Sequence, residues 1–342
     1  GELSVMALKQ SITQVVARHE TLQTIYPAVD GQPVPTKIGT TLEADALPVK
    51  DLTYLDKKAQ TAAVKQQIRQ QARSQFDLEQ GPLWTALLLQ LSDRKHILIL
   101  SFHHITIDGW SIGILLKELT ALYQASQSDQ DLSQILQPLP VTYSDYAAWQ
   151  QSLNLNDQRT YWQQQLSGLA PLLAMPTDYA RGAAALSEGS SYEFRLSQSE
   201  TVALQRFSQQ NKATLFMTLM AAFKALLYRY SGCTDLAIGT PIANRQRPEL
   251  EGLMGLFVNT LVIRTPVQDN PTFLDLLEQV RSVTLDAYSH QDFPFEQLVD
   301  ELDIPRTQSH TPLVQVLFSL QNSPLSSTKV SGLDWSPIAV ET

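Results

Sequence analysis

The chain contains almost no cysteine. Among its 342 residues only Cys233 carries a thiol, so no disulfide can form within it. It also has no uninterrupted apolar run near the roughly 20 residues that cross a bilayer as a helix. Both absences favour a cytoplasmic protein in a reducing compartment, without a membrane partner.

Positive charge is also scarce. The chain has 25 Lys and Arg against 34 Asp and Glu, which gives a net charge of -9. Nucleic-acid binding needs a basic surface, so we exclude nucleic acid as a general partner. Hydrophobic residues make up 43% of the chain and charged residues 17%, a balance typical of globular proteins. The length allows two domains, each with its own core.

Recognisable metal-binding patterns are missing as well. The sequence has neither an HExxH nor a CxxC pattern. Its adjacent histidines, His103 and His104, follow an apolar strand, in which neighbouring side chains point to opposite faces. Two such side chains do not face one ion, so we expect no metal site.

The chain does have this histidine pair at a position where catalytic groups are often held. Residues 96–100 form an apolar run that predicts a buried strand, and leucines at helical spacing follow Gly109. Between these elements lie His103, His104 and Asp108, on a turn flanked by rigid structure. Most histidines at strand ends are ordinary structural residues. An imidazole titrates near neutral pH, however, and therefore suits proton transfer when it faces a substrate.

The pattern along the chain predicts two halves that both mix strands and helices, hence an α/β (α+β) protein. In residues 1–166 we predict strands at 84–91 and 96–100 and helices at 5–18, 56–73, 141–151 and 158–166. Residues 167–191 are rich in Gly, Pro, Ser and Ala and predict a linker, the alternative being a long surface loop.

The second half, residues 192–342, restarts the pattern. We predict strands at 191–196, 235–239, 256–265 and 312–321, and helices at 199–210, 214–230, 272–288 and 295–302. The helix at 214–230 is strongly apolar. Its predicted buried residues are Phe216, Leu219, Phe223, Leu226 and Leu227.

Six segments stand out in order: RHETLQTIY at 18–26, HHITIDGWS at 103–111, YSDYAAW at 143–149, GLFVNTLVIR at 255–264, HQDFPFE at 290–296 and RTQSHTPL…LQN at 306–322. Each alone is a weak signal. Together they resemble the motifs RHExLRTxF, HHxxxDGxS, YxDFAxW, GxFVNTxxxR, HQDxPFE and RDxSRxPLFQV…LQN of nonribosomal peptide synthetase condensation domains. The resemblance covers essentially the whole chain.

The chain departs from the family pattern at a few positions. Gln23 replaces an arginine, Tyr26 a phenylalanine and His310 a second arginine, changes that we assign to packing or carrier contacts. The family's first motif and the last elements of its C-terminal lobe are also missing. We therefore expect a domain truncated at both ends.

The resemblance implies a fold of two chloramphenicol acetyltransferase-like lobes, arranged as a V-shaped pseudo-dimer with a tunnel at the interface. Residues 1–166 and 192–342 would form the lobes. A donor aminoacyl or peptidyl thioester and an acceptor aminoacyl thioester would arrive on the phosphopantetheine arms of carrier domains. The acceptor amine attacks the donor carbonyl and forms a peptide bond. Implied partners are the two carrier domains and an adenylation domain, and the domain itself needs no bound cofactor.

The resemblance also assigns site residues. His104 would be catalytic, orienting the acceptor amine or taking its proton. His103 would be structural. Asp108 is expected to point away from the substrate and to form a buried ion pair with Arg264 that fixes the loop.

Four further residues complete the implied site. Gly109 would let the substrate approach the backbone and would lend its amide to the oxyanion. Trp110, Ser111 and Asn259 are expected to line the tunnel.

Several other readings stay open. An acyltransferase for free substrates would share HxxxD but not the HQDxPFE or YxDFAxW motifs. An epimerisation domain differs after the aspartate, where Gly109-Trp110-Ser111 favours condensation. Heterocyclisation domains replace both histidines with aspartate. A catalytically silent platform that recruits carriers or tailoring enzymes tends to lose the second histidine or the glycine, and both are present here. The sequence does not identify the amino acids joined or the oligomeric state; we favour an L-configured donor.

Overall fold

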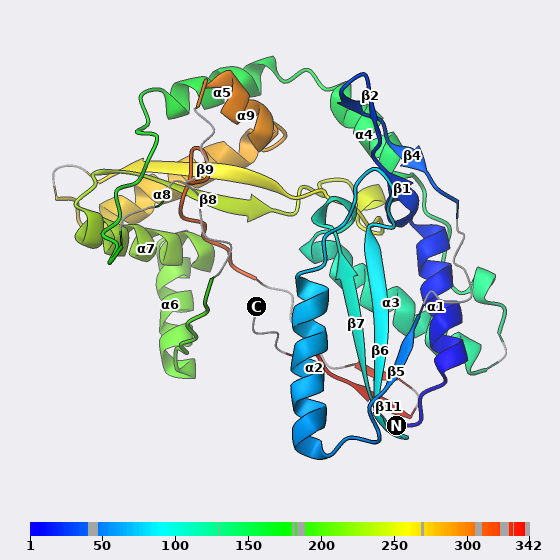
Figure 1. Cartoon of the computed structure of the whole chain (residues 1–342). Helices are drawn as coiled ribbons and strands as arrows, with labels where there is room; N and C mark the ends of the chain where they lie inside the picture. The colour runs from blue at the N-terminus through cyan, green and yellow to red at the C-terminus, as the bar shows by residue number, and fades with distance from the viewer. Residues whose placement is uncertain are drawn as a thin grey trace. The chain divides into compact units, whose positions relative to one another are not determined.

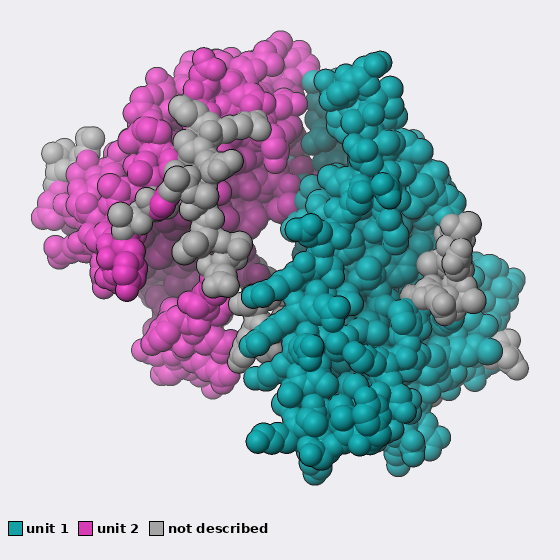
Figure 2. Space-filling model, viewed as in Figure 1, with its two compact units in different colours: residues 1–153, 245–257, 323–342 teal, residues 154–244, 258–322 magenta. Residues whose placement is uncertain are grey.

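The computed structural model describes residues 1–39, 47–128, 130–179, 182, 189–267, 270–304, 310–321, 328–330 and 332–338. They divide into two compact units, and neither unit is continuous in sequence. Unit 1 comprises residues 1–153, 245–257 and 323–342, and unit 2 comprises residues 154–244 and 258–322 (Figure 2). No helix in the described part of the chain has the length and apolar character to span a membrane.

A three-stranded sheet forms the centre of unit 1. β6 (Trp84–Ser92) pairs antiparallel with β7 (Lys95–Phe102) and parallel with β5 (Val49–Asp51). The two-residue turn between β6 and β7 falls where the sequence predicts it. This hairpin brings the end of β7, and the histidine pair that follows it, beside the start of β6.

Helices cover both faces of this sheet because strand side chains alternate in direction. Trp84, Ala86 and Leu88 pack into a core shared with α1 (Val5–Arg18) and α3 (Gly109–Ser126). Leu87 and Leu89 point the other way, toward α2 (Lys57–Ala72), which lies on the opposite face (Figure 1). α1 begins at the Ser4 cap and α2 at the Asp56 cap, each of which accepts a backbone N–H of the first turn.

Short elements complete unit 1. They are η1 (Glu20–Gln23), β1 (Thr24–Ile25) paired with β4 (Thr36–Lys37), β2 (Ala28–Val29) paired with β3 (Gln32–Pro33), η2 (His104–Thr106), η3 (Leu132–Gln134), α4 (Tyr143–Gln151), η4 (Pro248–Leu250) and β10 (Thr328–Val330) paired with β11 (Leu333–Trp335). Val330 and Leu333 join the same core as α1 and α3. Residues distant in sequence therefore complete this core.

Unit 2 is built on one long antiparallel strand pair. β8 (Asp235–Ile242) pairs with β9 (Asn259–Pro266) along its whole length. The helices of unit 2 are α5 (Asn156–Leu166), α6 (Gln198–Gln210), α7 (Leu215–Ser231), α8 (Phe273–Ser289) and α9 (Phe295–Glu301). α6, α7 and α8 each begin at a Ser or Thr cap with a capping box. Their apolar faces and the strand pair form one core.

The unit boundaries differ from the predicted lobes of 1–166 and 192–342. α5, predicted in the first lobe, belongs to unit 2. Residues 245–257, between β8 and β9, belong to unit 1, as do residues 323–342. We call residues 245–257 the crossover segment. The prediction assumed that each lobe is one stretch of chain, and composition carries no signal of a segment that returns to the other unit.

Two predicted strands are absent from the described residues. Residues 191–196 form no strand, and their alternating Tyr192, Phe194 and Leu196 are 90%, 76% and 48% exposed. Residues 312–321 contribute one isolated bridge, between Leu317 and Gly239 of β8. Both segments have the residues of a strand, but a strand needs a partner along its length.

Candidate functional site

His103 stabilises the turn that follows β7. It follows β7 and caps η2, where its Nδ1 accepts the N–H of Ile105 at 3.1 Å. Its backbone N–H donates to the carbonyl of Leu83 at 2.9 Å, which extends the β6–β7 hairpin by one bond. Its ring meets Phe76 edge-on, with 6.3 Å between centroids. These contacts fix the turn that carries the next residue.

His104 stands apart from its neighbours because its side chain is exposed. Among the described residues, its ring takes part in no hydrogen bond or ion pair. Both ring nitrogens are therefore available to a reactant, as proton donor or acceptor. The hairpin on one side and α3 on the other fix the backbone turn that carries this exposed imidazole.

Asp108 points into the protein. Its side chain is 3% exposed and caps α3, because Oδ1 accepts the N–H and the hydroxyl of Ser111 at 2.8 and 2.7 Å. Its Oδ2 accepts the N–H of Phe257, in the crossover segment, at 3.1 Å. Asp108 is thus a buried anchor between α3 and the crossover segment.

The predicted pairing of Asp108 with Arg264 is wrong. Arg264 lies on β9 and pairs with Asp235 of β8 at 2.8 Å. It also donates to the carbonyls of Gln165 and Ser167, at the end of α5. The arginine that faces Asp108 is Arg245, at 3.3 Å. The prediction chose the arginine of the strand motif, whereas the crossover segment carries the actual partner.

Arg245 anchors the crossover segment at its first residue. Its side chain is 1% exposed. One guanidinium nitrogen donates to the Leu253 carbonyl at 2.7 Å, and another to Ser111 Oγ at 3.0 Å. The guanidinium also lies 3.8 Å from the ring centre of Phe257, a cation–π contact. Burial lowers the pKa of Arg245, while Asp108 acts in the opposite direction.

Ser111 lies in this buried network, and the tunnel position predicted for it is wrong. It is 0% exposed. Its hydroxyl bonds Asp108 and the Gly255 carbonyl, at 2.7 and 3.1 Å, and accepts the Gly255 N–H. A hydroxyl in the first turn of a helix readily joins buried backbone groups, and here no part of it faces solvent.

Gly109 and Trp110 are the first two residues of α3. The first N–H groups of a helix have no intrahelical acceptor, and no acceptor for these two occurs among the described residues. Trp110 is 45% exposed, and its indole N–H donates to the Glu251 carbonyl at 3.0 Å. A Cβ built on Gly109 would meet no atom within 4 Å. The protein itself does not require glycine at this position.

Asn259 has no polar atom left for a tunnel. Its Nδ2 donates to the carbonyls of Gln291 and Phe293, at 2.9 and 2.8 Å. Its Oδ1 accepts the N–H groups of Phe295 and Thr260, at 3.0 and 2.9 Å. All four hydrogen-bonding positions of the amide are used. The side chain therefore links β9 to the turn before α9, and its place in a tunnel stays a prediction.

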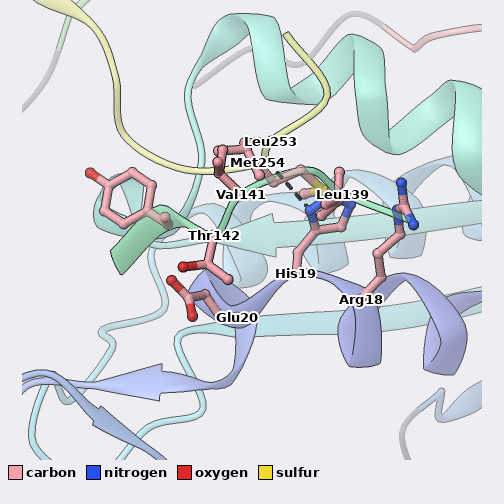
Figure 3. A pocket seen from close by; sticks show the side chains of 9 residues that line it. Arg18, His19, Glu20, Leu139, Val141, Thr142, Leu253 and Met254 are labelled. Atoms are coloured by element: carbon pink, nitrogen blue, oxygen red, sulfur yellow. Dashed lines mark hydrogen bonds between the residues drawn. The ribbon is translucent and has the colours of Figure 1, made fainter. Parts of the chain in front are cut away.

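The RHE motif also holds the crossover segment. Arg18 and His19 both bind Glu118 in the middle of α3, at 2.9 and 2.8 Å. The other ring nitrogen of His19 accepts the Met254 N–H at 3.4 Å (Figure 3). The hydroxyl of Thr21 donates to the Met254 carbonyl. A neutral His19 satisfies both contacts at once, with its proton on Nε2.

A cavity of about 100 Å³ lies beside this contact. Its lining comes from Arg18, His19 and Glu20, from residues 139 and 141–143, and from Leu253 and Met254 (Figure 3). The volume has room for a few water molecules and no substrate of aminoacyl size. We therefore do not place the reaction there.

The YxDFAxW and GxFVNT motifs meet within unit 1. The Tyr143 hydroxyl donates to the Leu256 carbonyl at 2.7 Å, and the Tyr143 ring lies edge-on to Phe257, 5.1 Å between centroids. The same ring would lie 2.4 Å from a Cβ at position 255. Gly255 is thus needed because the tyrosine occupies that space.

The HQDxPFE motif is structural in unit 2. The His290 ring stacks on Tyr161, with 3.9 Å between centroids, and the Trp162 indole donates to the His290 carbonyl. Gln158 of α5 bonds both Asp292 and the Phe293 N–H. The turn is therefore fastened to α5 and, through Asn259, to β9.

Comparison with known proteins identifies the chain. Residues 1–339 match the family model of the condensation domain, and the chain belongs to that family. It is 42% identical over 337 residues to a linear gramicidin synthase protein of Brevibacillus parabrevis, covering 97% of this chain and 6% of that protein. It is 40% identical over 341 residues to malpinin synthetase of Mortierella alpina, covering 98% of this chain and 4% of that protein. The chain thus spans a small part of the curated relatives that it matches.

Solved structures agree with this assignment. The chain is similar to the X-domain of teicoplanin biosynthesis, solved in complex with OxyB, at 28% identity and a TM-score of 0.83, over 93% of this chain and 69% of that one. The first condensation domain of the calcium-dependent antibiotic synthetase matches at 20% identity and a TM-score of 0.71, over 93% of this chain and 72% of that one, which shows the fold. The predicted mixed α/β fold of the chloramphenicol acetyltransferase type is confirmed.

Proposed function

We propose that the chain joins a donor aminoacyl or peptidyl thioester to the amine of an acceptor aminoacyl thioester, in nonribosomal peptide synthesis. The observation that carries this proposal is the contrast between His104 and its neighbours. Asp108 and Ser111 are buried and fully bonded, and His103 caps η2, whereas His104 is exposed with a free ring. Such an arrangement is typical of a positioned side chain that awaits a reactant.

In the proposed reaction the acceptor nitrogen forms a bond to the donor carbonyl carbon, and the C–S bond of the donor thioester breaks. His104 orients the amine or takes its proton, and this proton ends on the departing sulfur, so the donor arm leaves as a thiol. Negative charge develops on the carbonyl oxygen. The free amide of Gly109, at the positive end of α3, is placed to stabilise it.

The substrates would arrive on phosphopantetheine arms, so we propose donor and acceptor carrier domains as partners, together with an adenylation domain that loads the acceptor. Family membership supports this, because the matched synthase is many times longer than this chain. The domain contributes His104 and the α3 terminus. Among the described residues no group of three His, Cys, Asp or Glu side chains is arranged to hold a metal ion.

A second candidate is a silent platform that recruits a partner protein. The likeness to the teicoplanin X-domain favours it, since that domain forms a complex with OxyB. Against it stands the presence here of both His104 and Gly109, the residues that a platform does not need.

The two candidates are separated by one experiment. Donor and acceptor carrier proteins are loaded with aminoacyl-phosphopantetheine and mixed with the domain, and the acceptor carrier is read by intact mass spectrometry. We expect the acceptor to gain the mass of one donor residue with the native chain, and no gain with a folded His104→Ala variant. An equal mass gain with both proteins would show that the reaction does not need His104. Absence of gain with the native chain, over a panel of acyl groups, would favour the platform.

Gly109→Ala gives a second prediction. Apart from its chain neighbours and the backbone of α3, no protein atom lies within 4 Å of the added Cβ. Alanine also suits a first helical turn, so the melting temperature should stay unchanged. If the substrate carbonyl approaches this amide, the methyl group displaces it, and we expect turnover to fall by roughly a hundredfold. Thermal melts and the carrier assay measure the two effects. Full activity in this variant would mean that no substrate approaches the α3 terminus here.

A further inference from the structure

α7 buries a lysine in the core of unit 2. Lys224 is 0% exposed and is among the largest fully buried side chains. Its Nζ donates to the carbonyl of Leu236 in β8 at 2.8 Å and to the carbonyl of Ile263 in β9 at 2.7 Å. One amine thus ties a helix to both strands of the pair on which unit 2 is built.

The surroundings of Lys224 supply almost no compensating charge. The carboxylate that acts on it is Asp235, at the start of β8, and Asp235 is already bonded three times by Arg264 of β9. The buried face of α8 carries no titratable side chain. On the side of α7, Arg229 and Tyr230 are exposed, and Tyr228 and Cys233 are half-buried.

The two carbonyl acceptors match the number of N–H donors on a neutral lysine amine. A neutral lysine has two N–H donors, and the two carbonyls use both, whereas an ammonium group has a third proton without an acceptor among the described residues. Burial lowers the pKa of Lys224 to about 7, and Asp235 opposes this shift. The neutral form is thus the one that the core accommodates.

The tie lies at strands that matter for the site. β8 runs into the crossover segment, and β9 starts directly after it, at Asn259. The crossover segment in turn holds Asp108 and the start of α3 within unit 1. The two strands that Lys224 joins therefore flank the crossover segment in the sequence.

We propose that Lys224 is a proton-sensitive tie, whose neutral amine holds α7 to β8 and β9 and whose protonation loosens unit 2. This inference concerns the fold and does not depend on the reaction. The direction of the pH effect on stability follows from the protons that the folded and unfolded states bind. In the unfolded chain the lysine keeps its proton up to about pH 10.5, while in the folded chain it loses it above about 7. Between these values the unfolded state binds more protons, so stability rises with pH and is lost as pH falls toward 7.

The test compares chemical denaturation of three proteins from pH 6 to pH 10. In the native chain we expect Lys224 to make the unfolding equilibrium constant fall by up to tenfold for each unit that the pH rises between about 7 and 10. Lys224→Met keeps the stem and removes the proton, so its profile should lack that part of the slope. Lys58→Met, the same change at an exposed position of α2, should keep it. Equal slopes for the native chain and Lys224→Met would overturn the proposal.

A direct titration covers the case in which Lys224→Met does not fold. In the native chain with ¹³C-labelled lysine, the Cε signal that is absent from Lys224→Gln should titrate near pH 7, well below the other lysines. Glutamine does not titrate and also has two N–H donors, so this variant removes the Lys224 signal while two donors remain in the core. A Cε midpoint for Lys224 near 10 would show that the amine stays charged in the core, and would overturn the proposal.

Discussion

Arg245→Ala should destabilise unit 1 by about 3–5 kcal/mol, because it leaves the buried carboxylate of Asp108 without its counter-ion. The Asp108 and Arg245 side chains are 3% and 1% exposed, so the native pair has almost no contact with water. The substitution also removes the donor to the Leu253 carbonyl and the guanidinium over Phe257. Chemical denaturation with a probe in unit 1 measures the loss. A cost under about 1 kcal/mol, typical of exposed pairs, would contradict the buried pair.

A double-mutant cycle distinguishes the observed partner from the predicted one. Asp108→Asn keeps a side-chain oxygen to cap α3 but removes the charge. We expect a coupling energy of about 1–3 kcal/mol between Asp108→Asn and Arg245→Met, and almost none between Asp108→Asn and Arg264→Met. Arg264 serves as the matched control, since it also forms an ion pair and binds backbone carbonyls. Coupling to Arg264 instead would restore the pairing predicted from the strand motif.

The Arg245 variants should also lose catalytic activity. Asp108 holds the first turn of α3, which carries the Gly109 amide, and the crossover segment binds the same carboxylate through Phe257. We therefore expect Arg245 variants to lose turnover even below their melting temperature. The loss should appear in kcat more than in KM, because the positions of reacting groups change rather than the binding of the carriers.

Much of the fold follows from local pattern. α1 starts and ends at the predicted residues 5 and 18, and α2, predicted at 56–73, runs from Lys57 to Ala72. The β6–β7 hairpin also lies where alternation and the turn place it. These elements are predictable because caps, periodicity and turn residues act over a few positions. The position of His104 on the turn after β7 follows from the same signals.

The rest depends on contacts between distant segments. In α7 the prediction buried Leu226, which is 50% exposed, and passed over Lys224, which is 0% exposed. A hydrophobic pattern cannot identify a lysine whose amine meets two strand carbonyls. The family resemblance implies tunnel positions for Ser111 and Asn259. In the structure Ser111 bonds Gly255, and Asn259 bonds the turn before α9.

The crossover segment explains why several motifs have their residues. Arg18, His19, Asp108 and Tyr143 all lie in family motifs of the first half. Either directly or through Glu118, each contributes to holding residues 245–257 or the helix that binds them. The sequence showed the motifs in order, but not that they converge on one segment. That convergence requires the return of the chain from unit 2 to unit 1.

Gly255→Ala should produce the second large effect. The new Cβ would lie 2.4 Å from two carbons of the Tyr143 ring, closer than such atoms approach, so either the ring or the crossover segment must move. The ring is held by its hydroxyl on the Leu256 carbonyl and by Tyr146 and Phe257, so the segment shifts. We expect a loss of about 2–3 kcal/mol in stability from this overpacking.

The shift should also reach the site. Gly255 bonds the Ser111 hydroxyl through both its N–H and its carbonyl, and Phe257, two residues on, donates to Asp108. Displacing this stretch of backbone strains the cap of α3, so turnover should fall along with stability. Gly252→Ala is the control in the same segment, since its Cβ would meet its nearest atom at an ordinary 3.5 Å. It should change stability and turnover little.

Tyr143→Ala tests the cause of the clash. Removing the ring costs packing by itself, but it also frees the space that the new Cβ needs. Gly255→Ala should then cost far less in the Tyr143→Ala background than in the native chain, a coupling of about 1–3 kcal/mol measured by denaturation of all four proteins. If the two losses simply add, the glycine is needed for its backbone conformation and not for the ring, and the contact between these two motifs does not explain why position 255 is glycine.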